Sequence, residues 1–228
     1  MKHNLIIYPQ YELTIEEKMI RVMIADDHAI VRQGLKQILS ETSDISVTGE
    51  AETGFQALKI IRQQDFDVML LDISLPDRNG IEILKQIKKD RPNLMVLMLS
   101  MHNESEFALR ALKAGASGYL SKQSAPAQLV TAIRQVSDGN KYISPALAQE
   151  LANAWTSETD RPLHENLSDR EYQTLCLIAS GKSLSEISIE MCLSPKTVSV
   201  YRARMMEKLK ISNNSELVRY AIKHKLVD

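Results

Sequence analysis

The sequence between residues 21 and 138 repeats one pattern five times, a short apolar run followed by an amphipathic helical segment. The apolar runs lie at 21–25, 45–50, 67–71, 95–99 and 118–120, and the helical segments at about 29–40, 54–63, 80–89, 104–114 and 126–137. Strands that alternate with helices form parallel sheets through right-handed crossovers. We therefore expect an α/β fold with a doubly wound, five-stranded parallel sheet.

Polar residues with useful chemistry stand where four of these strands end. Asp26 and Asp27 follow the first strand, Asp72 the third, Ser100 the fourth and Lys122 the fifth. In the flavodoxin-like strand order 2-1-3-4-5, strands 1, 3, 4 and 5 are neighbours, so their carboxyl ends meet at one edge of the sheet. Each residue alone has an ordinary explanation, such as a capped turn or a surface lysine. Their joint placement predicts one functional site.

The three aspartates also predict what that site holds. Carboxylates packed together repel one another strongly unless a cation lies among them. A small set of hard oxygen ligands suits Mg²⁺, which keeps several of its waters. The lysine and the hydroxyl on the other side of Asp72 would suit an incoming phosphoryl group. We therefore expect a magnesium site with room for a phosphoryl group beside Asp72.

The segment 167–226 carries helix signals only. Ser168 and Ser183 each begin a capping box, and Ser194-Pro195 supplies an N-cap followed by a proline at the first helical position. We expect four short helices here, of which two are joined by a tight turn at 192–194. A short helix, a tight turn and a second capped helix are typical of a helix-turn-helix motif.

The helix expected at 195–209 combines an apolar stripe with a polar face. Four residues recur at helical spacing and are assigned to the core, namely Val198, Tyr201, Met205 and Leu209. The residues predicted to face DNA are Lys196, Thr197, Ser199, Val200, Arg202, Ala203, Arg204 and Lys208. A charged helix face is usually only solvated. Here it follows a helix-turn-helix turn, and segment 167–228 carries ten Lys and Arg against seven Asp and Glu, which permits a nucleic-acid partner.

The remaining segments give weaker signals. Residues 1–20 form an N-terminal extension that fits none of the repeating elements up to Lys18, either an arm or the product of a start codon placed too far upstream. Residues 139–162 are expected to be a linker with one helix at about 146–155.

The cysteines and the apolar runs bear on location. Cys176 and Cys192 lie in apolar helical patterns with no CxxC motif and no histidine ligand set nearby. This usage favours buried, reduced thiols and a cytoplasmic protein. No apolar run approaches the length of a membrane span, so no membrane partner is expected.

Residues 21–138 resemble the receiver domain of bacterial two-component response regulators. The resemblance is carried by Asp26-Asp27-His28, Asp72, Leu75-Pro76-Asp77-Arg78-Asn79-Gly80, Ser100 and Gly115-Ala116-Ser117-Gly118-Tyr119-Leu120-Ser121-Lys122. It implies that Asp72 is the phosphoacceptor for a sensor histidine kinase. Asp27, Asp72 and the backbone carbonyl of Ser74 would ligate Mg²⁺, with Asp26 acting largely through water. The phosphoryl-binding and switch residues would be Ser100, Tyr119, whose ring would turn inward on phosphorylation, and Lys122.

Residues 163–228 resemble the LuxR-type DNA-binding domain of the NarL/FixJ response regulators. The resemblance is carried by Leu167-Ser168-Asp169-Arg170-Glu171, Ala179-Ser180-Gly181-Lys182-Ser183, Leu193-Ser194-Pro195-Lys196-Thr197-Val198 and Lys208-Leu209. It implies a motif from Leu184 to Ala203 that binds double-stranded promoter DNA, with two copies paired on half-sites after phosphorylation. The entry to the recognition helix is similar to that of the global activators of the UvrY and GacA kind.

The family's base-edge positions fall on Ser199, Val200 and Ala203, where many relatives carry lysine. Small and apolar side chains there weaken the expectation of a strong contact with guanine. Val200 and Ala203 could instead meet a thymine methyl group.

Two other classes of function fit the sequence less well. An aspartyl-phosphate enzyme of the haloacid-dehalogenase type needs a second aspartate two residues after the nucleophile, and Ser74 stands there. A ligand-sensing LuxR-type regulator needs an apolar ligand chamber in its N-terminal half, for which the sequence gives no evidence. A phosphorylation-controlled transcription regulator fits both halves of the chain.

Overall fold

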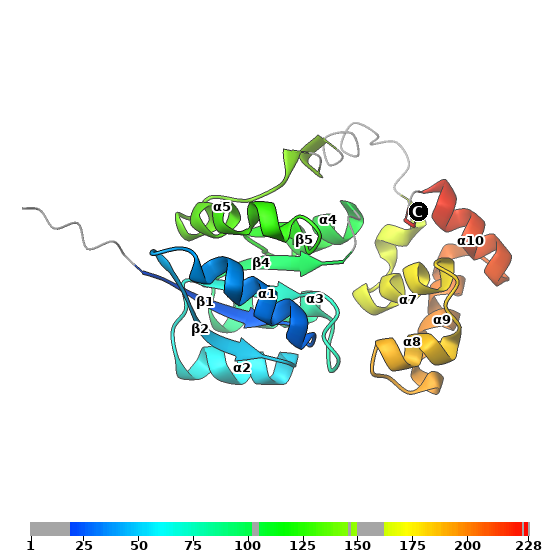
Figure 1. Cartoon of the computed structure of the whole chain (residues 1–228). Helices are drawn as coiled ribbons and strands as arrows, with labels where there is room; N and C mark the ends of the chain where they lie inside the picture. Colours follow the sequence, from blue (N-terminus) through cyan, green and yellow to red (C-terminus); the bar gives the residue numbers. More distant parts are fainter. Residues whose placement is uncertain (1–18, 102–104, 146, 150–161, 225, 228) are drawn as a thin grey trace, which may run out of the picture.

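The computed structural model describes residues 19–101, 105–145, 147–149, 162–224 and 226–227 (Figure 1). Its first part is built on five parallel strands. They are β1 (Ile20–Ala25), β2 (Ile45–Ala51), β3 (Val68–Asp72), β4 (Met95–Ser100) and β5 (Gly118–Ser121). The strand order is β2-β1-β3-β4-β5, so the predicted doubly wound topology is confirmed.

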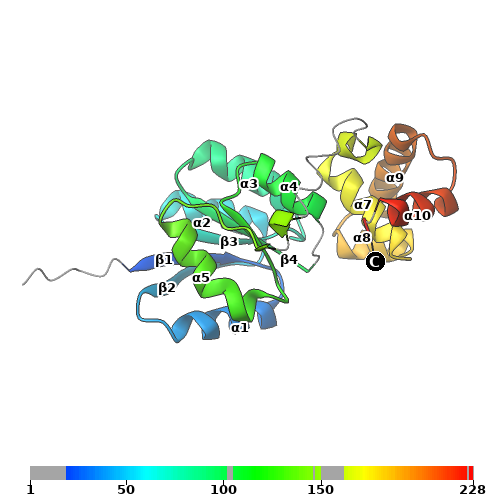
Figure 2. The ribbon, with the colours of Figure 1, turned by 90° about the horizontal axis from the view of Figure 1, so that it is seen from above.

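Helices cover both faces of this sheet. They are α1 (Ala29–Ser40), α2 (Gly54–Gln63), α3 (Gly80–Asp90), α4 (Ser105–Lys113) and α5 (Ala125–Ser137). Helices α1 and α5 pack on one face and α2, α3 and α4 on the other (Figure 2). Because β3 is central and covered on both sides, all five of its residues are buried. The buried strand therefore delivers Asp72 to the sheet edge on a rigid support.

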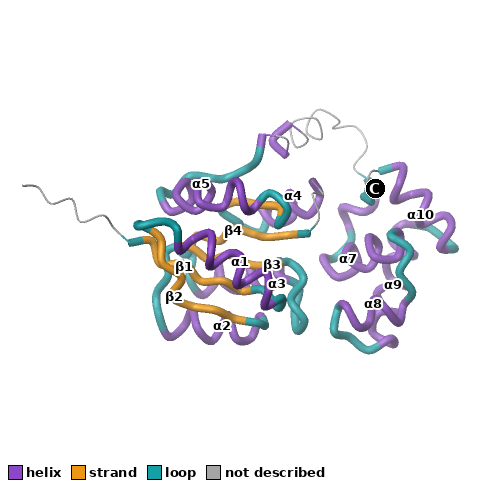
Figure 3. Tube along the Cα trace, in the orientation of Figure 1, coloured by secondary structure: helices purple, strands orange, loops and turns teal. Residues whose placement is uncertain are grey.

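The described residues from Pro162 on form helices and connecting loops (Figure 3). They are a 3-10 turn η1 (Leu163–Asn166), α7 (Asp169–Ala179), α8 (Leu184–Glu190), α9 (Pro195–Leu209) and α10 (Asn214–Lys223). Both predicted capping boxes form, since Ser168 pairs with Glu171 and Ser183 with Glu186. The four α-helices and the helix-turn-helix of α8 and α9 agree with the sequence pattern.

Two packing predictions need correction. Val198, Met205 and Leu209 are buried as expected, but Tyr201 is only half-buried, and Met206 takes the additional core position at 8% exposure. The buried state predicted for both cysteines is wrong for Cys192, which is exposed at the turn before α9 with a positive φ of 49°. Helical spacing predicts burial only within a helix, and Cys192 lies in the turn between α8 and α9, so the pattern wrongly predicted a buried thiol.

Some predicted segments fall outside the described residues. These are residues 1–18 and most of the helix expected at 146–155. None of the helices that the structure describes is both long enough and apolar enough to cross a lipid bilayer.

Candidate functional site

The strand-end residues converge as the topology requires. The Nζ atom of Lys122, after β5, lies 2.7 Å from Oδ2 of Asp26, after β1, and 2.8 Å from Oδ2 of Asp72, at the end of β3. Asp26 and Asp72 are 0% and 1% exposed. Asp27 is the most accessible member, with a side chain that is 32% exposed. We call Asp26, Asp27, Asp72 and Lys122 the acidic edge.

Short hydrogen bonds hold the first two aspartates in place. The backbone N–H of Asp26 donates to the carbonyl of Ala51 at 3.1 Å, and the N–H of His28 donates to Oδ1 of Asp26 at 2.9 Å. Nδ1 of His28 lies 2.7 Å from Oδ1 of Asp27. Ligand atoms of Asp26, Asp27, His28 and Asp72 all lie within 4.8 Å of one another. This oxygen-rich donor set fits Mg²⁺, which prefers carboxylates and water.

The charges of the acidic edge do not cancel, because one ammonium group faces three carboxyl groups. Burial is the main influence on the Asp72 carboxyl and raises its pKa, against the attraction of Lys122. Burial alone would lower the pKa of Lys122, but Asp72 and Asp26 outweigh it, so this pKa is raised. Oδ2 of Asp26 is buried and has no hydrogen-bond partner of good geometry, although Lys122 is within ion-pair distance. The edge can therefore accommodate an additional cation.

The loop after β3 is locked at two points. Asn79 is fully buried and caps α3 through its Oδ1, which accepts from the N–H of Ile81 at 2.8 Å. The carboxylate of Asp77 accepts from the N–H groups of Gly54 and Phe55 at the start of α2, at 2.7 and 2.8 Å. Position 80 must be glycine, because a Cβ there would lie 2.1 Å from the carbonyl oxygen of Asp72. The loop therefore fixes the backbone around Asp72.

The predicted switch residues lie on the neighbouring strands β4 and β5. Ser100 and Tyr119 are 3% and 4% exposed. The N–H of Lys122 donates to the carbonyl of Ser100 at 2.7 Å, so β4 helps to position the lysine. Ser74 contributes a backbone hydrogen bond to the Asp72 carboxyl.

Helix α9 presents a coherent outer face. Six of the predicted DNA-facing residues are exposed, and one of them, Lys208, is paired inside the domain. The other five lie on one side of the helix: Lys196, Ser199, Val200, Ala203 and Arg204. We call these five residues the outer face of α9. Thr197 is half-buried, and its Oγ1 lies 2.8 Å from the N-cap hydroxyl of Ser194.

Two other predicted DNA contacts have partners inside the domain. Arg202 donates through Nε and Nη2 to Oδ1 of Asn214, at 3.1 and 2.8 Å. Nζ of Lys208 donates to Oε2 of Glu171 at 2.6 Å. These side chains tie α9 to α10 and α7, so they must leave their partners before they can contact a phosphate group.

Sequence reasoning missed the contact between the two parts of the chain. Arg110 of α4 donates to the carbonyls of His164 and Leu167, both at 2.7 Å, and its guanidinium lies 4.5 Å from the ring centre of Tyr172. The ring of Phe107 meets that of Tyr172 edge-on at 4.8 Å. An arginine near a helix end gives no sequence signal for such a role, because solvated surfaces carry the same residues.

Helix α3 adds polar contacts to this junction. Nζ of Lys85 lies 2.8 Å from Oδ2 of Asp169, and Nδ2 of Asn79 donates to Oε1 of Gln173 at 3.2 Å. All of these contacts are made by η1, Leu167 or α7, whereas the outer face of α9 stays exposed. The first part of the chain therefore holds the second by α7 without covering the predicted DNA face.

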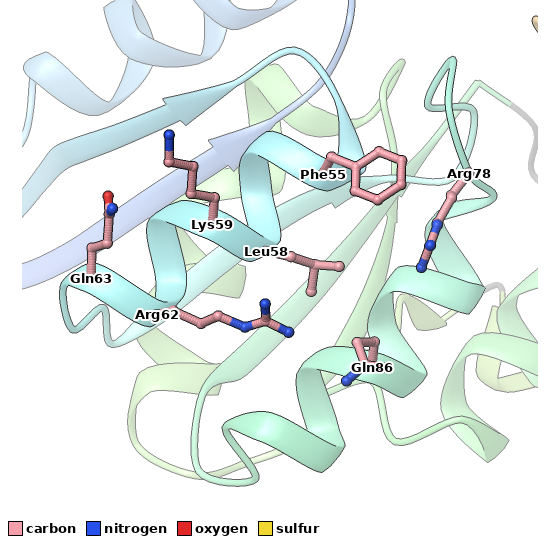
Figure 4. Close-up of a pocket in the computed structure, with 7 residues that line it drawn as sticks. All are labelled: Phe55, Leu58, Lys59, Arg62, Gln63, Arg78 and Gln86. Carbon is pink, nitrogen blue, oxygen red and sulfur yellow. The ribbon is translucent and has the colours of Figure 1, made fainter.

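A shallow hollow of about 420 Å³ lies between α2 and α3 (Figure 4). It is lined by Phe55, Leu58, Lys59, Arg62, Gln63, Arg78 and Gln86, with Arg78 stacked 4.6 Å from the ring centre of Phe55. Its lining contains no residue of the acidic edge, so it is separate from the site described above.

Two family models match the chain. The response regulator receiver domain matches residues 22–134, and the luxR family of bacterial regulatory proteins matches residues 165–221. The chain is 40% identical to the response regulator UvrY of Escherichia coli strain K12 over 210 residues, which cover 91% of this chain and 96% of that protein. It is 38% identical to the response regulator GacA of Pseudomonas aeruginosa over 212 residues, 92% of this chain and 99% of that protein.

Solved structures show the same two-part architecture. The RcsB response regulator of Salmonella typhimurium covers 90% of this chain and 98% of its own, with a TM-score of 0.67 and 28% identity. A structure of two RcsB dimers bound to two parallel DNAs has a TM-score of 0.57 and 29% identity over 90% of this chain and 98% of its own.

Proposed function

Because the chain belongs to the response regulators that join a receiver domain to a LuxR-type DNA-binding domain, we propose that Asp72 is the phosphoacceptor through which it regulates transcription. Phosphorylation-dependent transcription regulation is the activity of this family. The observation that carries the assignment is the placement of the Asp72 carboxylate, 1% exposed and 2.8 Å from Lys122, at the edge where Asp26 and Asp27 also converge. We assign the receiver to 21–138, the linker to 139–162 and the DNA-binding domain to 163–228.

The transfer itself needs little from the protein beyond position and charge. An Asp72 carboxylate oxygen attacks the phosphorus of a phosphohistidine on a sensor kinase, so an oxygen–phosphorus bond forms as the nitrogen–phosphorus bond breaks. The kinase histidine leaves and takes up a proton. The chain is thus modified itself and is not an enzyme in the usual sense.

Asp27, Asp72 and the backbone carbonyl of Ser74 are the proposed magnesium ligands, and Asp26 acts through water. Bound Mg²⁺ would supply charge stabilisation for the transferred phosphoryl oxygens. Lys122 exchanges its ion pairs with Asp26 and Asp72 for the new phosphoryl group, and Ser100 donates its hydroxyl to that group. The existing pairs of Lys122, at 2.7 and 2.8 Å, support this role because the ammonium already lies at the site of charge change.

The outer face of α9 is proposed to enter the major groove of promoter DNA. Ser199, Val200 and Ala203 would face base edges, while Lys196, Thr197 and Arg204 would contact phosphates. Arg202 and Lys208 would contribute only after leaving Asn214 and Glu171. One small domain makes few contacts, so we propose that two copies of the chain bind paired half-sites. The solved RcsB dimers on DNA support this arrangement.

The exposed state of α9 bears on how phosphorylation acts. The sequence leaves two alternatives open. Phosphorylation could free a recognition helix that the receiver covers, or it could promote the pairing of two copies. In the present conformation the receiver contacts η1 and α7, and the outer face of α9 is exposed. We therefore favour the pairing of two copies as the effect of phosphorylation.

The thiols of Cys176 and Cys192 are consistent with the proposed cytoplasmic location.

Incubation with acetyl phosphate and Mg²⁺, followed by intact-protein mass spectrometry, tests the proposal. The wild-type chain should gain one phosphoryl group, and Asp72→Asn should gain none. Asp65→Asn, in an exposed pair with Arg91, is the matched control and should behave as wild type. Equal labelling of the Asp72→Asn variant would refute the assignment.

A further inference from the structure

Helix α1 breaks its own hydrophobic pattern at one position. Its buried stripe consists of Arg32, Leu35 and Leu39, at the spacing of one helix face. The Arg32 side chain is only 10% exposed, in a position where the pattern predicts an apolar residue. Burying a guanidinium is costly unless it is paired and hydrogen bonded. A residue that departs from the local rule in this way is a candidate for a functional role.

The contacts of Arg32 connect two loops at the sheet edge. Its Nη1 donates to the backbone carbonyl of Asp26 at 2.7 Å, and its Nη2 donates to Oε1 of Glu52, after β2, at 2.5 Å. Its Nε has no hydrogen-bond partner but lies within ion-pair distance of Oε2 of Glu50, at 3.6 Å, and the Oε1 of Glu50 pairs with Lys36 at 2.6 Å. The guanidinium therefore ties the main chain of the Asp26–Asp27 turn to the loop that follows β2.

We propose that Arg32 is a positioning residue for the magnesium site, an inference that rests on the proposed function of the acidic edge. Arg32 donates to the carbonyl of Asp26, while Ala51 accepts from the N–H of the same residue at 3.1 Å. The backbone of Asp26 is thus fixed from both sides, and Asp27 follows directly. Arg32 itself donates to this backbone and to Glu52 rather than to Asp72.

Repulsion among the carboxylates explains why such an anchor is needed. Asp72 ends the central strand β3 and cannot move without disturbing the sheet. The β1–α1 turn is the part that can move, and repulsion from Asp72 would push Asp26 and Asp27 away. By holding the turn, Arg32 keeps their oxygens converged before the metal binds. Mg²⁺ therefore binds more tightly, because little free energy is needed to bring its ligands together.

Titration calorimetry of Mg²⁺ into the full-length chain tests this role directly, because it reads metal binding without phosphoryl transfer. Arg32→Met keeps the length and loses the donors, and should weaken Mg²⁺ binding by about 10-fold, the lower end for groups that orient metal ligands. Arg32→Lys can reach one acceptor and should recover part of the loss. Arg134→Met on α5, which removes an exposed pair with Asp44, should leave Mg²⁺ binding unchanged.

The same variants should be followed by acetyl phosphate labelling over a range of Mg²⁺ concentrations. Arg32→Met should shift the half-saturating Mg²⁺ concentration upward by the same factor, and saturating Mg²⁺ should restore a rate within about 3-fold of wild type. A lower melting temperature with unchanged Mg²⁺ affinity would show a purely structural arginine and overturn the proposal. Failure of the wild-type chain to label at all would instead count against the assignment of Asp72.

Discussion

At the acidic edge, the side chains of Asp26, Asp72 and Lys122 are buried and the ammonium lies 2.7 and 2.8 Å from the two carboxylates, whereas the outer face of α9 carries small and apolar side chains between two exposed cations. The edge is assembled before any ligand arrives, since the sheet, the Asp77 cap and the Arg32 contacts fix its atoms. On α9 the helix backbone is fixed, and the cations Lys196 and Arg204 are exposed.

This contrast indicates two kinds of recognition. A phosphoryl group has one shape and one charge, so a rigid, charge-matched pocket serves it well. DNA offers a long backbone and variable bases, and a face with few committed hydrogen bonds can follow it. Ser199, Val200 and Ala203 allow close approach, and the neighbouring Lys196 and Arg204 supply attraction that does not depend on sequence.

Removing the central cation should produce the largest change. Lys122→Met leaves Asp26 and Asp72 buried without their ion-pair partner, and we expect the free energy of unfolding at pH 7 in EDTA to fall by about 3 kcal/mol. Mg²⁺ should recover much of this loss, and it should bind more tightly than to wild type because the ammonium no longer competes. Urea unfolding with and without Mg²⁺ measures both effects. Lys59 is an exposed lysine of α2, so Lys59→Met should change neither the unfolding free energy nor Mg²⁺ binding. An equal loss of stability in both variants would show that the ion pairs of Lys122 do not stabilise the acidic edge.

The convergence of the acidic edge was predictable because topology alone determines it. Five alternating strands and helices fix a parallel sheet, and the sheet places the ends of neighbouring strands together. Asp26, Asp72 and Lys122 follow such ends directly. The capping boxes were predictable for a similar reason, since Ser168 and Glu171 interact three residues apart along the chain.

Contacts made by long side chains were not predictable. Periodicity showed that Arg202 and Lys208 lie off the core stripe, but not that they reach Asn214 and Glu171. It also predicts an apolar residue at the position of Arg32, and it does not indicate that this arginine reaches the Asp26 carbonyl and the Glu52 carboxylate. The role of Arg110 depends on how two separately folded parts meet, which neither part encodes locally.

The next largest effect is expected where the receiver contacts η1 and α7. Arg110→Ala removes two hydrogen bonds to carbonyls and the stacking on Tyr172, which together should weaken the contact by about 2 kcal/mol. Hydrogen exchange should therefore become at least about 10-fold faster in the amides of η1 and the first turn of α7. Lys113→Ala on the same helix is the control. If exchange in η1 and α7 does not change, the two parts do not depend on this arginine for their contact.

A titrating histidine within the junction gives a pH test. Burial, with smaller effects from His224 and Arg110, lowers the pKa of His164 from 6.5 to about 4. Between these values the unfolded chain binds a proton that the folded chain excludes, so stability should rise with pH from about 4 to 6.5 and be independent of this group above 6.5. His164→Asn keeps a polar group near the Tyr220 hydroxyl, 3.1 Å from Nδ1, and should flatten this part of the profile. Thermal unfolding from pH 4 to 7 measures this. If stability depends on pH in the same way in His164→Asn and in wild type, the low pKa of His164 is contradicted.

The smallest expected effect separates the two arginines of α9. Arg204 lies on the outer face and should contact a DNA phosphate, so Arg204→Ala should weaken binding to all sequences and lower the slope of log affinity against log salt by about one. Arg202 is held by Asn214, so Arg202→Ala should lower the unfolding free energy by about 1 kcal/mol and leave the salt slope unchanged. Val200 substitutions should change which sequences are preferred while keeping the slope. Fluorescence anisotropy at several salt concentrations measures all three. If Arg202→Ala lowered the slope and Arg204→Ala did not, the DNA face would lie nearer α10, where Arg219 and Lys223 are the next basic pair at helical spacing.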